Sequence, residues 1–356
     1  MQGKIKKAFP GGNTCYGSYS FFDNIIPENI KRIFCLKGGP GVGKSSLMKS
    51  IARHFNDIGY DVELFNCPSD PSSLDALVIK EIGVVLLDGT APHIVDPKLP
   101  GAKDEIINLG VLLNTVKMEE NREEIEKVDY QISAYFKRAY KYLAAAQKVY
   151  QDIEEKNSHA LKLDELNSMT ESFICDIFKD IQNVGKYHKV VDLFASAVTP
   201  VGYLDHTKYV IPEGTKTFFL DGRIGTGKSD FMKKIVTIAN LKGLKVEAYH
   251  FPLIPEKLET VYLPELEIAF STSILFGDSN KIDFDKFLDI EKLAVFEEAL
   301  QTDEKILDTL IKEAISSLES AKSTHDVLEK YYVPNMDFAK VDEVKEDLIE
   351  RIKYYI

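Results

Sequence analysis

The chain has 356 residues, of which 44% are hydrophobic and 28% charged, and its formal net charge is −12 at pH 7. This length suits two or three domains, and the acidic balance argues against nucleic acids or anionic membranes as partners. The N-terminal segment lacks the apolar run of a signal peptide, and no stretch reaches the length of a membrane span. The four cysteines show no Cys-x-x-Cys spacing, so we expect a soluble, cytoplasmic protein with reduced thiols.

The first element that carries chemistry is a glycine-rich loop between an apolar run at residues 33–36 and a helical pattern from Leu47 to Phe55. The loop reads Gly38-Gly39-Pro40-Gly41-Val42-Gly43-Lys44-Ser45-Ser46. This G-x-x-x-x-G-K-S motif between a strand and a helix predicts a P-loop. In a P-loop, backbone N–H groups and the lysine hold nucleotide phosphates and the serine hydroxyl ligates Mg²⁺. An ordinary glycine-rich turn would need neither the lysine nor the hydroxyl.

Two further apolar runs, residues 62–65 and 82–87, predict strands after this helix. The second run ends in Asp88-Gly89. An apolar strand that delivers an aspartate to the sheet edge near a P-loop is a Walker-B-type arrangement, which gives Asp88 the role of Mg²⁺-side carboxylate. The alternative is a strand that simply ends in an Asp-Gly turn.

Two more residues in nearby loops are candidates for catalysis. Asp70 could position the attacking water and His93 could sense the γ-phosphate. Loops at the carboxyl edge of a sheet are rich in Asp and His capping groups, so a plain loop role is the competing interpretation for both.

The whole unit occurs twice. A second motif reads Gly222-Arg223-Ile224-Gly225-Thr226-Gly227-Lys228-Ser229, and the two motif lysines are 228 − 44 = 184 positions apart. The same offset pairs Pro68 with Pro252 and Asp75 with Glu259. We therefore predict an α/β protein of two duplicated P-loop NTPase domains, residues 1–192 and 193–356, each with a parallel sheet covered by helices on both faces.

A long helical arm ends each copy, at about residues 105–190 and 284–356. Apolar residues follow a heptad seam in both arms. The seam of the first arm comprises Ile125, Val128, Ile132, Tyr135, Ala139, Tyr142, Ala146, Val149 and Ile153. In the second arm it comprises Leu293, Phe296, Leu300, Leu307, Leu310, Ala314, Ala321, Leu328 and Tyr331. Such an arm would either form a coiled coil with a protein partner or the other arm, or fold back on its own domain.

The second copy differs where chemistry requires acid groups. The position that corresponds to Asp88 is Thr272, which carries no negative charge, and Asp70 aligns with Ile254. We expect the second copy to keep the phosphate cradle as a regulatory or degenerate nucleotide site.

Three segments of the first copy carry a family resemblance: Phe22-Asp23 with Ile26-Pro27, the glycine-rich motif, and residues 62–65 followed by Ser69-Asp70-Pro71. They resemble the front of a RecA/KaiC-type ATPase core, a family that also contains tandem cores, although Ser69-Asp70 stands where that family has paired glutamates. The tandem arrangement with residues 88–93 also resembles an uncharacterised group of duplicated bacterial P-loop ATPases.

These patterns predict a P-loop NTPase that binds ATP with Mg²⁺ and hydrolyses it in the first copy. Asn280-Lys281-Ile282-Asp283 spells a guanine-binding motif but lacks the preceding hydrophobic strand, so ATP is expected over GTP. The alternatives are a small-metabolite kinase, which the scarcity of arginines disfavours, and a nucleotide-gated scaffold without catalysis.

Overall fold

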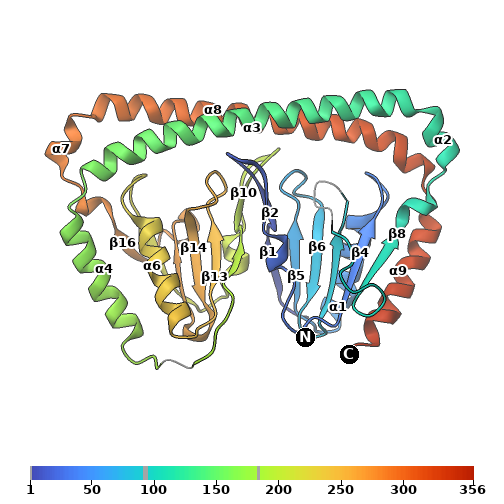
Figure 1. Ribbon diagram of the computed structural model, residues 1–356, viewed down its shortest axis with the longest axis horizontal. Coiled ribbons are helices and arrows are strands. Elements are labelled where there is room, and N and C mark those ends of the chain that lie inside the picture. The colour runs from blue at the N-terminus through green and yellow to red at the C-terminus, as the bar shows by residue number, and fades with distance from the viewer. Residues whose placement is uncertain (1, 91–94, 183–184) are drawn as a thin grey trace.

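A computed structural model of the chain describes residues 2–90, 95–182 and 185–356. Two six-stranded sheets with the same topology face each other, and two long helices cross above both (Figure 1). The first sheet has the order β1-β5-β6-β7-β4-β8, with β1 (Ile5–Ala8), β4 (Arg32–Lys37), β5 (Val62–Asn66), β6 (Leu74–Ile79), β7 (Val84–Asp88) and β8 (Asp104–Asn108). The second has the order β9-β13-β14-β15-β12-β16, with β9 (Val191–Leu193), β12 (Lys216–Asp221), β13 (Glu247–His250), β14 (Leu258–Leu263), β15 (Ile268–Ser271) and β16 (Asn280–Asp283).

The α/β class and the duplication are confirmed, but the prediction of parallel sheets is wrong. In the first sheet β6 runs antiparallel to both β5 and β7, and β14 does the same in the second. The reason lies in the connections: residues 67–73 join β5 to β6, and residues 80–83 join β6 to β7. Neither is long enough for the crossover that parallel neighbours need.

Each sheet is covered by helices on one face only. Helix α1 (Lys44–Asp57) and helix α9 (Phe338–Lys353) pack on the first sheet, while α6 (Lys228–Leu241) and α4 (Leu163–Phe178) pack on the second. The opposite faces of the two sheets share one core, in which Cys35 and Val85 of the first half join Tyr249 and Ala269 of the second. Helices on both faces of each sheet were expected, and the other half's sheet takes the place of one helical layer.

A pair of hairpins joins the halves. They are β2 (Gly11–Thr14) with β3 (Gly17–Ser20), and β10 (Ser196–Thr199) with β11 (Gly202–Asp205). Just before them, the backbones of Phe9 and Phe194 exchange two hydrogen bonds of 2.9 and 3.1 Å, and both side chains are fully buried. These two residues mark the place where the two copies meet.

The long helices of the two arms pair with each other, but their contact differs in part from the expected seams. Leu143 and Leu318 are buried although neither was expected in a seam, and Tyr135 of the first seam is 37% exposed. Helix α3 (Arg122–His159) and helix α8 (Glu297–Tyr332) pack along their length, with Ala139, Leu143, Ala314 and Leu318 buried between them. Of the expected alternatives, the contact with the other arm is the one observed. We call this α3–α8 pair the rod.

The arms are exchanged between the halves. Beyond the rod, α4 of the first copy packs against α6 of the second, through Leu166 and Phe231. Helix α9 of the second copy packs against α1 of the first, through Leu348 and Ile51. Each sheet is therefore covered by its own loop helix and by the last helix of the other copy's arm.

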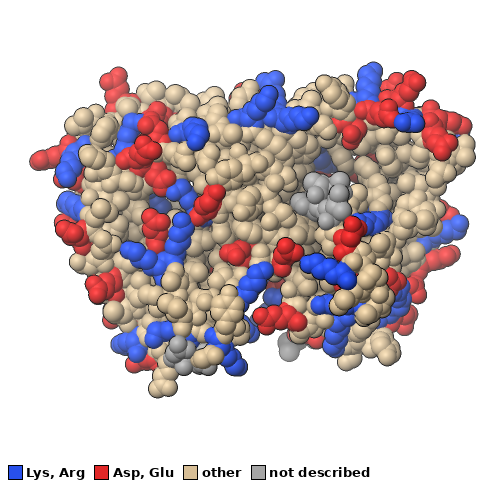
Figure 2. Space-filling view, viewed as in Figure 1, with Lys and Arg blue, Asp and Glu red and all other residues tan. Residues whose placement is uncertain are grey.

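Short helices complete the connections: α2 (Thr115–Glu120), α5 (Thr207–Val210) and α7 (Ile290–Ala294). No helix within the described residues combines the length and the apolar character that a membrane crossing requires. On the face shown in Figure 2, acidic and basic side chains are interspersed, so this face offers no broad region of a single charge.

Candidate functional site

The first glycine loop, residues 38–45, connects β4 to the N-terminus of α1. Gly43 caps the helix with a φ of 95°, a left-handed conformation that glycine adopts without strain. The ammonium group of Lys44 donates hydrogen bonds to the carbonyls of Gly38 (2.7 Å) and Gly39 (2.9 Å). Burial lowers the pKa of Lys44, while the charge of Asp88 acts in the opposite direction. The lysine predicted to hold phosphates thus lies folded over its own loop.

Asp88 reaches this lysine from the adjacent strand. It ends β7, directly beside Leu36 of β4, and its carboxylate lies 3.5 Å from the Lys44 ammonium. Thr90 holds the segment in place, because its N–H donates to Asp88 (2.9 Å) and its hydroxyl donates to the carbonyl of Gly38 (3.0 Å). The structure therefore brings together the predicted lysine and the predicted carboxylate.

Ser45 is the other predicted Mg²⁺ ligand. Its hydroxyl oxygen accepts a hydrogen bond from the Leu74 N–H at 3.0 Å, which leaves a second lone pair available. Mg²⁺ in nucleotide sites takes oxygen ligands from one or two carboxylates, a hydroxyl and substrate phosphates, and keeps several waters. Ser45 and Asp88 fit this chemistry. Within the described residues no group of three or more His, Cys, Asp or Glu side chains could hold a metal unaided.

Asp75 is the residue that the sequence-based search missed as a candidate. It lies at the start of β6, where the pairing with β5 shifts register between Phe65 and Asn66, and such bulges re-aim side chains. Its neighbour Leu74 contacts Ser45, and its carboxyl feels the charges of Asp88 and Lys44. Burial, with Asp88 beside it, raises the pKa of Asp75 to about 7.

A signal for Asp75 was present in the sequence, because the repeat offset pairs it with Glu259. Glu259 occupies the same bulge in the second half, between β13 and β14. Burial raises its pKa to about 7, although Ser196 and Tyr203 hydrogen-bond to it. The sequence signal was an acidic residue at the same repeat position in both copies.

Asp70, another catalytic candidate, lies in the turn between β5 and β6, and its charge acts on the carboxyl of Asp75. Asp70 accepts hydrogen bonds from the Ser72 hydroxyl (2.7 Å) and the Ser73 hydroxyl (2.8 Å), and its carboxylate lies 3.7 Å from the Lys322 ammonium. Burial opposes these contacts, but together they lower the pKa of Asp70. Asp70 therefore shapes the turn above Ser45. His93 lies outside the described residues.

The second glycine loop, residues 222–229, repeats this geometry between β12 and α6. Lys228 donates to the carbonyls of Gly222 and Arg223, the latter at 2.6 Å. Burial lowers the pKa of Lys228 to about 8. Ser229 accepts from the Leu258 N–H at 2.9 Å, as Ser45 does from Leu74.

This loop opens into a cavity of about 600 Å³, within the size range of small-molecule sites. We call it the second-loop cavity. Its polar lining includes Lys228, Ser229, Lys257 and Glu259. Its apolar lining includes Tyr150, Leu161, Leu166, Phe251, Leu253, Leu307 and Ile311.

The electrostatics of the two loops differ. Thr272 occupies the place of Asp88, and its hydroxyl donates to the carbonyl of Glu259 at 3.3 Å. Asp285 accepts a hydrogen bond of 2.7 Å from the Arg223 N–H of the second loop. At the first loop the corresponding neighbour is Gly110, which has no side chain. The second loop thus has an acidic side chain, Asp285, beside its backbone N–H groups. It lacks an acidic side chain at the strand end, where the first copy has Asp88.

Each loop is covered by the rod, through the arm of the other copy. At the first loop, a Cβ added to Gly39 would lie 2.6 Å from the ring of Tyr332, and one added to Gly41 would lie 2.8 Å from Val333. At the second loop, Asn157 and Ser158 donate to the carbonyls of Ile224 (2.7 Å) and Gly225 (3.0 Å). The sequence did not predict these contacts between the helix ends and the glycine loops, because a heptad pattern does not specify the surface against which a helix end packs.

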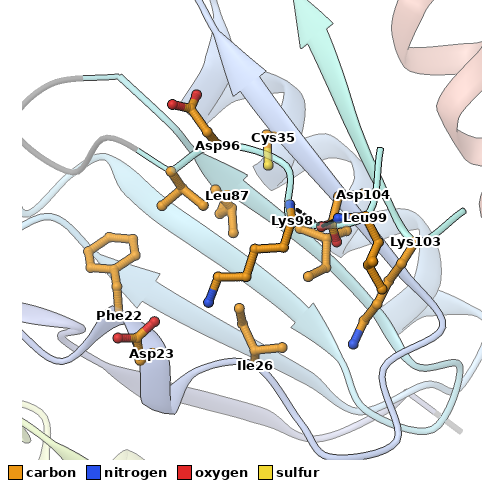
Figure 3. Close-up of a pocket in the computed structure, with 12 residues that line it drawn as sticks. Phe22, Asp23, Ile26, Cys35, Leu87, Asp96, Lys98, Leu99, Lys103 and Asp104 are labelled. Atoms are coloured by element: carbon orange, nitrogen blue, oxygen red, sulfur yellow. Dashed lines mark hydrogen bonds between the residues drawn. The ribbon is translucent and has the colours of Figure 1, made fainter. Parts of the chain in front are cut away.

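A smaller cavity of about 360 Å³ lies on the other face of the first sheet (Figure 3). Cys35 and Leu87 line it, and both belong to the core between the sheets. Asp104 accepts hydrogen bonds from the N–H groups of Lys98 (2.6 Å) and Leu99 (2.8 Å) at its edge. The sheet separates this cavity from Lys44.

Comparison with known proteins identifies no relative: no family model, no curated protein and no solved structure matches this chain.

Proposed function

We propose that the protein is a P-loop ATPase, that ATP with Mg²⁺ binds at the first glycine loop, and that hydrolysis takes place there. One observation carries the proposal. Lys44, at the N-terminus of α1, lies 3.5 Å from Asp88, and the Leu74 N–H donates to Ser45. The carboxyl of Asp75 lies within electrostatic range of Lys44 and Asp88, whereas Thr272 replaces Asp88 at the second loop. A phosphate cradle, a lysine, a hydroxyl and carboxylates on adjacent strands are the groups that phosphoryl transfer requires.

In this assignment Lys44 leaves the carbonyls of Gly38 and Gly39 and binds the β- and γ-phosphates. Ser45 and Asp88 would hold Mg²⁺, which would supply charge neutralisation at the phosphates. Asp75 acts on the attacking water. A carboxyl whose pKa lies near 7 both accepts and releases a proton under ordinary conditions, which suits a general base.

A small-metabolite kinase remains the second candidate, and a scaffold that binds ATP without chemistry is the third. The protein's six arginines are Arg32, Arg53, Arg122, Arg138, Arg223 and Arg351. Kinases usually close an arginine-bearing lid over the phosphates. At the first loop the covering residues are Glu329, Tyr332 and Val333, none of them an arginine, so ATP hydrolysis is favoured over transfer to an acceptor.

The test is product analysis with purified full-length protein, ATP and Mg²⁺. We expect equal amounts of ADP and inorganic phosphate. Lys44→Ala should abolish both, and Lys228→Ala should change the rate without abolishing it. ADP formed only after an acceptor is added, without phosphate release, would identify a kinase. Binding with no product would identify a scaffold.

A further inference from the structure

The rod touches both glycine loops, so the two sites share one covering element. Near its start, α8 contributes Leu307 and Ile311 to the wall of the second-loop cavity. At its end, Tyr332 lies against Gly39 of the first loop. Ile311 and Tyr332 are 21 residues apart on one helix, which corresponds to about 30 Å. A single continuous helix therefore connects the two sites.

Helix α3 makes the reciprocal connection. Its end covers the second loop, where Glu154 packs against Gly225 and pairs with Lys257. Its beginning packs beside the end of α8, since Val128 and Ile132 contact Leu328 in a small core. Both ends of the rod are thus fixed to a glycine loop, each through the arm that comes from the other half.

The contacts at the first loop include charged side chains. Glu329 lies along Gly41, and its carboxylate lies within electrostatic range of both Lys44 and Lys322. Lys322 in turn faces Asp70 at 3.7 Å. A phosphate chain that recruits Lys44 would bring negative charge next to Glu329, so binding at the first loop favours movement of this end of the rod away from the loop.

The second-loop cavity has the chemistry of a nucleoside phosphate site. The hydrogen bonds of Lys228 to its glycine loop repeat those of Lys44, although Asp285 accepts from the Arg223 N–H of this loop. The apolar walls around Tyr150 and Phe251 suit a base and sugar. Thr272 in place of Asp88 removes one metal-side carboxylate, which suits a site that binds without rapid turnover.

We propose that the second-loop cavity is a regulatory nucleotide site and that the rod is a lid shared by both loops, so that nucleotide at one loop promotes binding at the other. The inference rests on the proposed ATP binding at the first loop. The physical basis is that the ligand that binds first lifts a packed helix pair, and the second ligand no longer has to. By thermodynamic reciprocity, each site must strengthen the other by the same factor.

Calorimetric titration of the full chain with Mg²⁺ and a non-hydrolysable ATP analogue tests this. We expect wild type to bind two molecules with positive cooperativity. Lys228→Ala should bind one molecule, at the first loop, with an affinity at least about five-fold weaker than in the doubly occupied protein, because couplings between sites usually span about 5- to 150-fold. Lys44→Ala should show the same factor at the second loop. If Lys228→Ala does not fold, Lys228→Met removes the ammonium with less loss of packing.

The rod is tested by Tyr332→Ala, which removes its contact with Gly39, with Tyr331→Ala as the matched control on the same helical turn. Only Tyr332→Ala should reduce the cooperativity factor toward one, with two molecules still bound. One bound molecule in wild type, two independent ones, or negative cooperativity would overturn the inference and leave ATP binding at the first loop intact. Absence of binding, or binding that Lys44→Ala does not affect, would instead contradict the proposed function.

Discussion

Replacement of Asp75 by asparagine should stabilise the protein at alkaline pH. Asp75 is only 6% exposed, and burial raises the pKa of its carboxyl from 3.8 to about 7. The folded state therefore holds the proton more tightly than the unfolded state. Between pH 3.8 and about 7 the unfolded chain ionises while the folded chain stays protonated, so the stability contributed by this group falls as the pH rises. Above pH 7 the full cost of burying the charge remains.

The shift of about three pH units corresponds to about 4 kcal/mol, at about 1.4 kcal/mol per unit. Asparagine fills nearly the same volume and does not ionise, so the variant avoids this cost. We expect its unfolding free energy to exceed that of wild type by an amount that grows by about 2 to 3 kcal/mol between pH 5 and pH 8. Glu259, which titrates in the same range, is present in both proteins and cancels in the difference.

Urea unfolding followed by circular dichroism at a series of pH values measures this difference. Glu259→Gln is the matched control, since the pKa of Glu259 is also raised to about 7 by burial. Relative to wild type, both variants should become more stable as the pH rises, but only Asp75→Asn should lose ATP hydrolysis, by about 10²- to 10⁴-fold if Asp75 is the general base. A stability difference that is independent of pH would show that folding does not raise the pKa of Asp75.

Three other predictions follow from single contacts. Asp88→Asn should reduce Mg²⁺-dependent hydrolysis by about 10- to 100-fold and raise the Mg²⁺ concentration needed for half-maximal rate; an unchanged Mg²⁺ dependence would contradict the metal-side role. Gly39→Ala should destabilise the protein by about 1 to 3 kcal/mol, because its Cβ would lie 2.6 Å from Tyr332. Thermal unfolding measures this cost, and a combined Tyr332→Ala substitution should recover it. Leu318→Ala, at a fully buried position in the rod, should cost about 2 to 5 kcal/mol; Ile306→Ala, at 43% exposure on the same helix, should cost far less, and equal losses would show that the rod is not a packed core.

The local features of the fold could be predicted from the sequence. The glycine-rich motif placed a loop between β4 and α1 correctly, and the repeat offset predicted the same unit at residues 222–229. Both features depend on short-range patterns, which one sequence displays directly.

The order and direction of the strands could not be predicted, because they depend on which strands pair with each other in the sheet. The buried run at Leu74–Ile79 contains Asp75 and follows a turn rich in Ser and Pro, so it was not recognised as a strand. Without β6, the two apolar strands on either side of it were assumed to be parallel neighbours. Asp75 was overlooked for the same reason, since its role depends on a bulge in a strand that had not been assigned.

The exchange of the arms between the two halves could not be predicted from the sequence either. The heptad seams predicted two long helices and left open whether these pair with each other; α3 and α8 do pair. Which loop each helix end covers depends on packing between residues far apart in the chain, such as Tyr332 with Gly39 and Asn157 with Ile224. Nothing in the seam specifies such contacts.

The most direct test of the central claim, that chemistry takes place at the first loop, is a single-turnover experiment with radiolabelled ATP on wild type, Lys44→Ala and Lys228→Ala. Enzyme is kept in excess, and bound nucleotide is extracted and separated over time. We predict that wild type and Lys228→Ala convert bound ATP to ADP and phosphate, whereas Lys44→Ala does not. Conversion by Lys44→Ala at the wild-type rate, or its loss only in Lys228→Ala, would contradict the account.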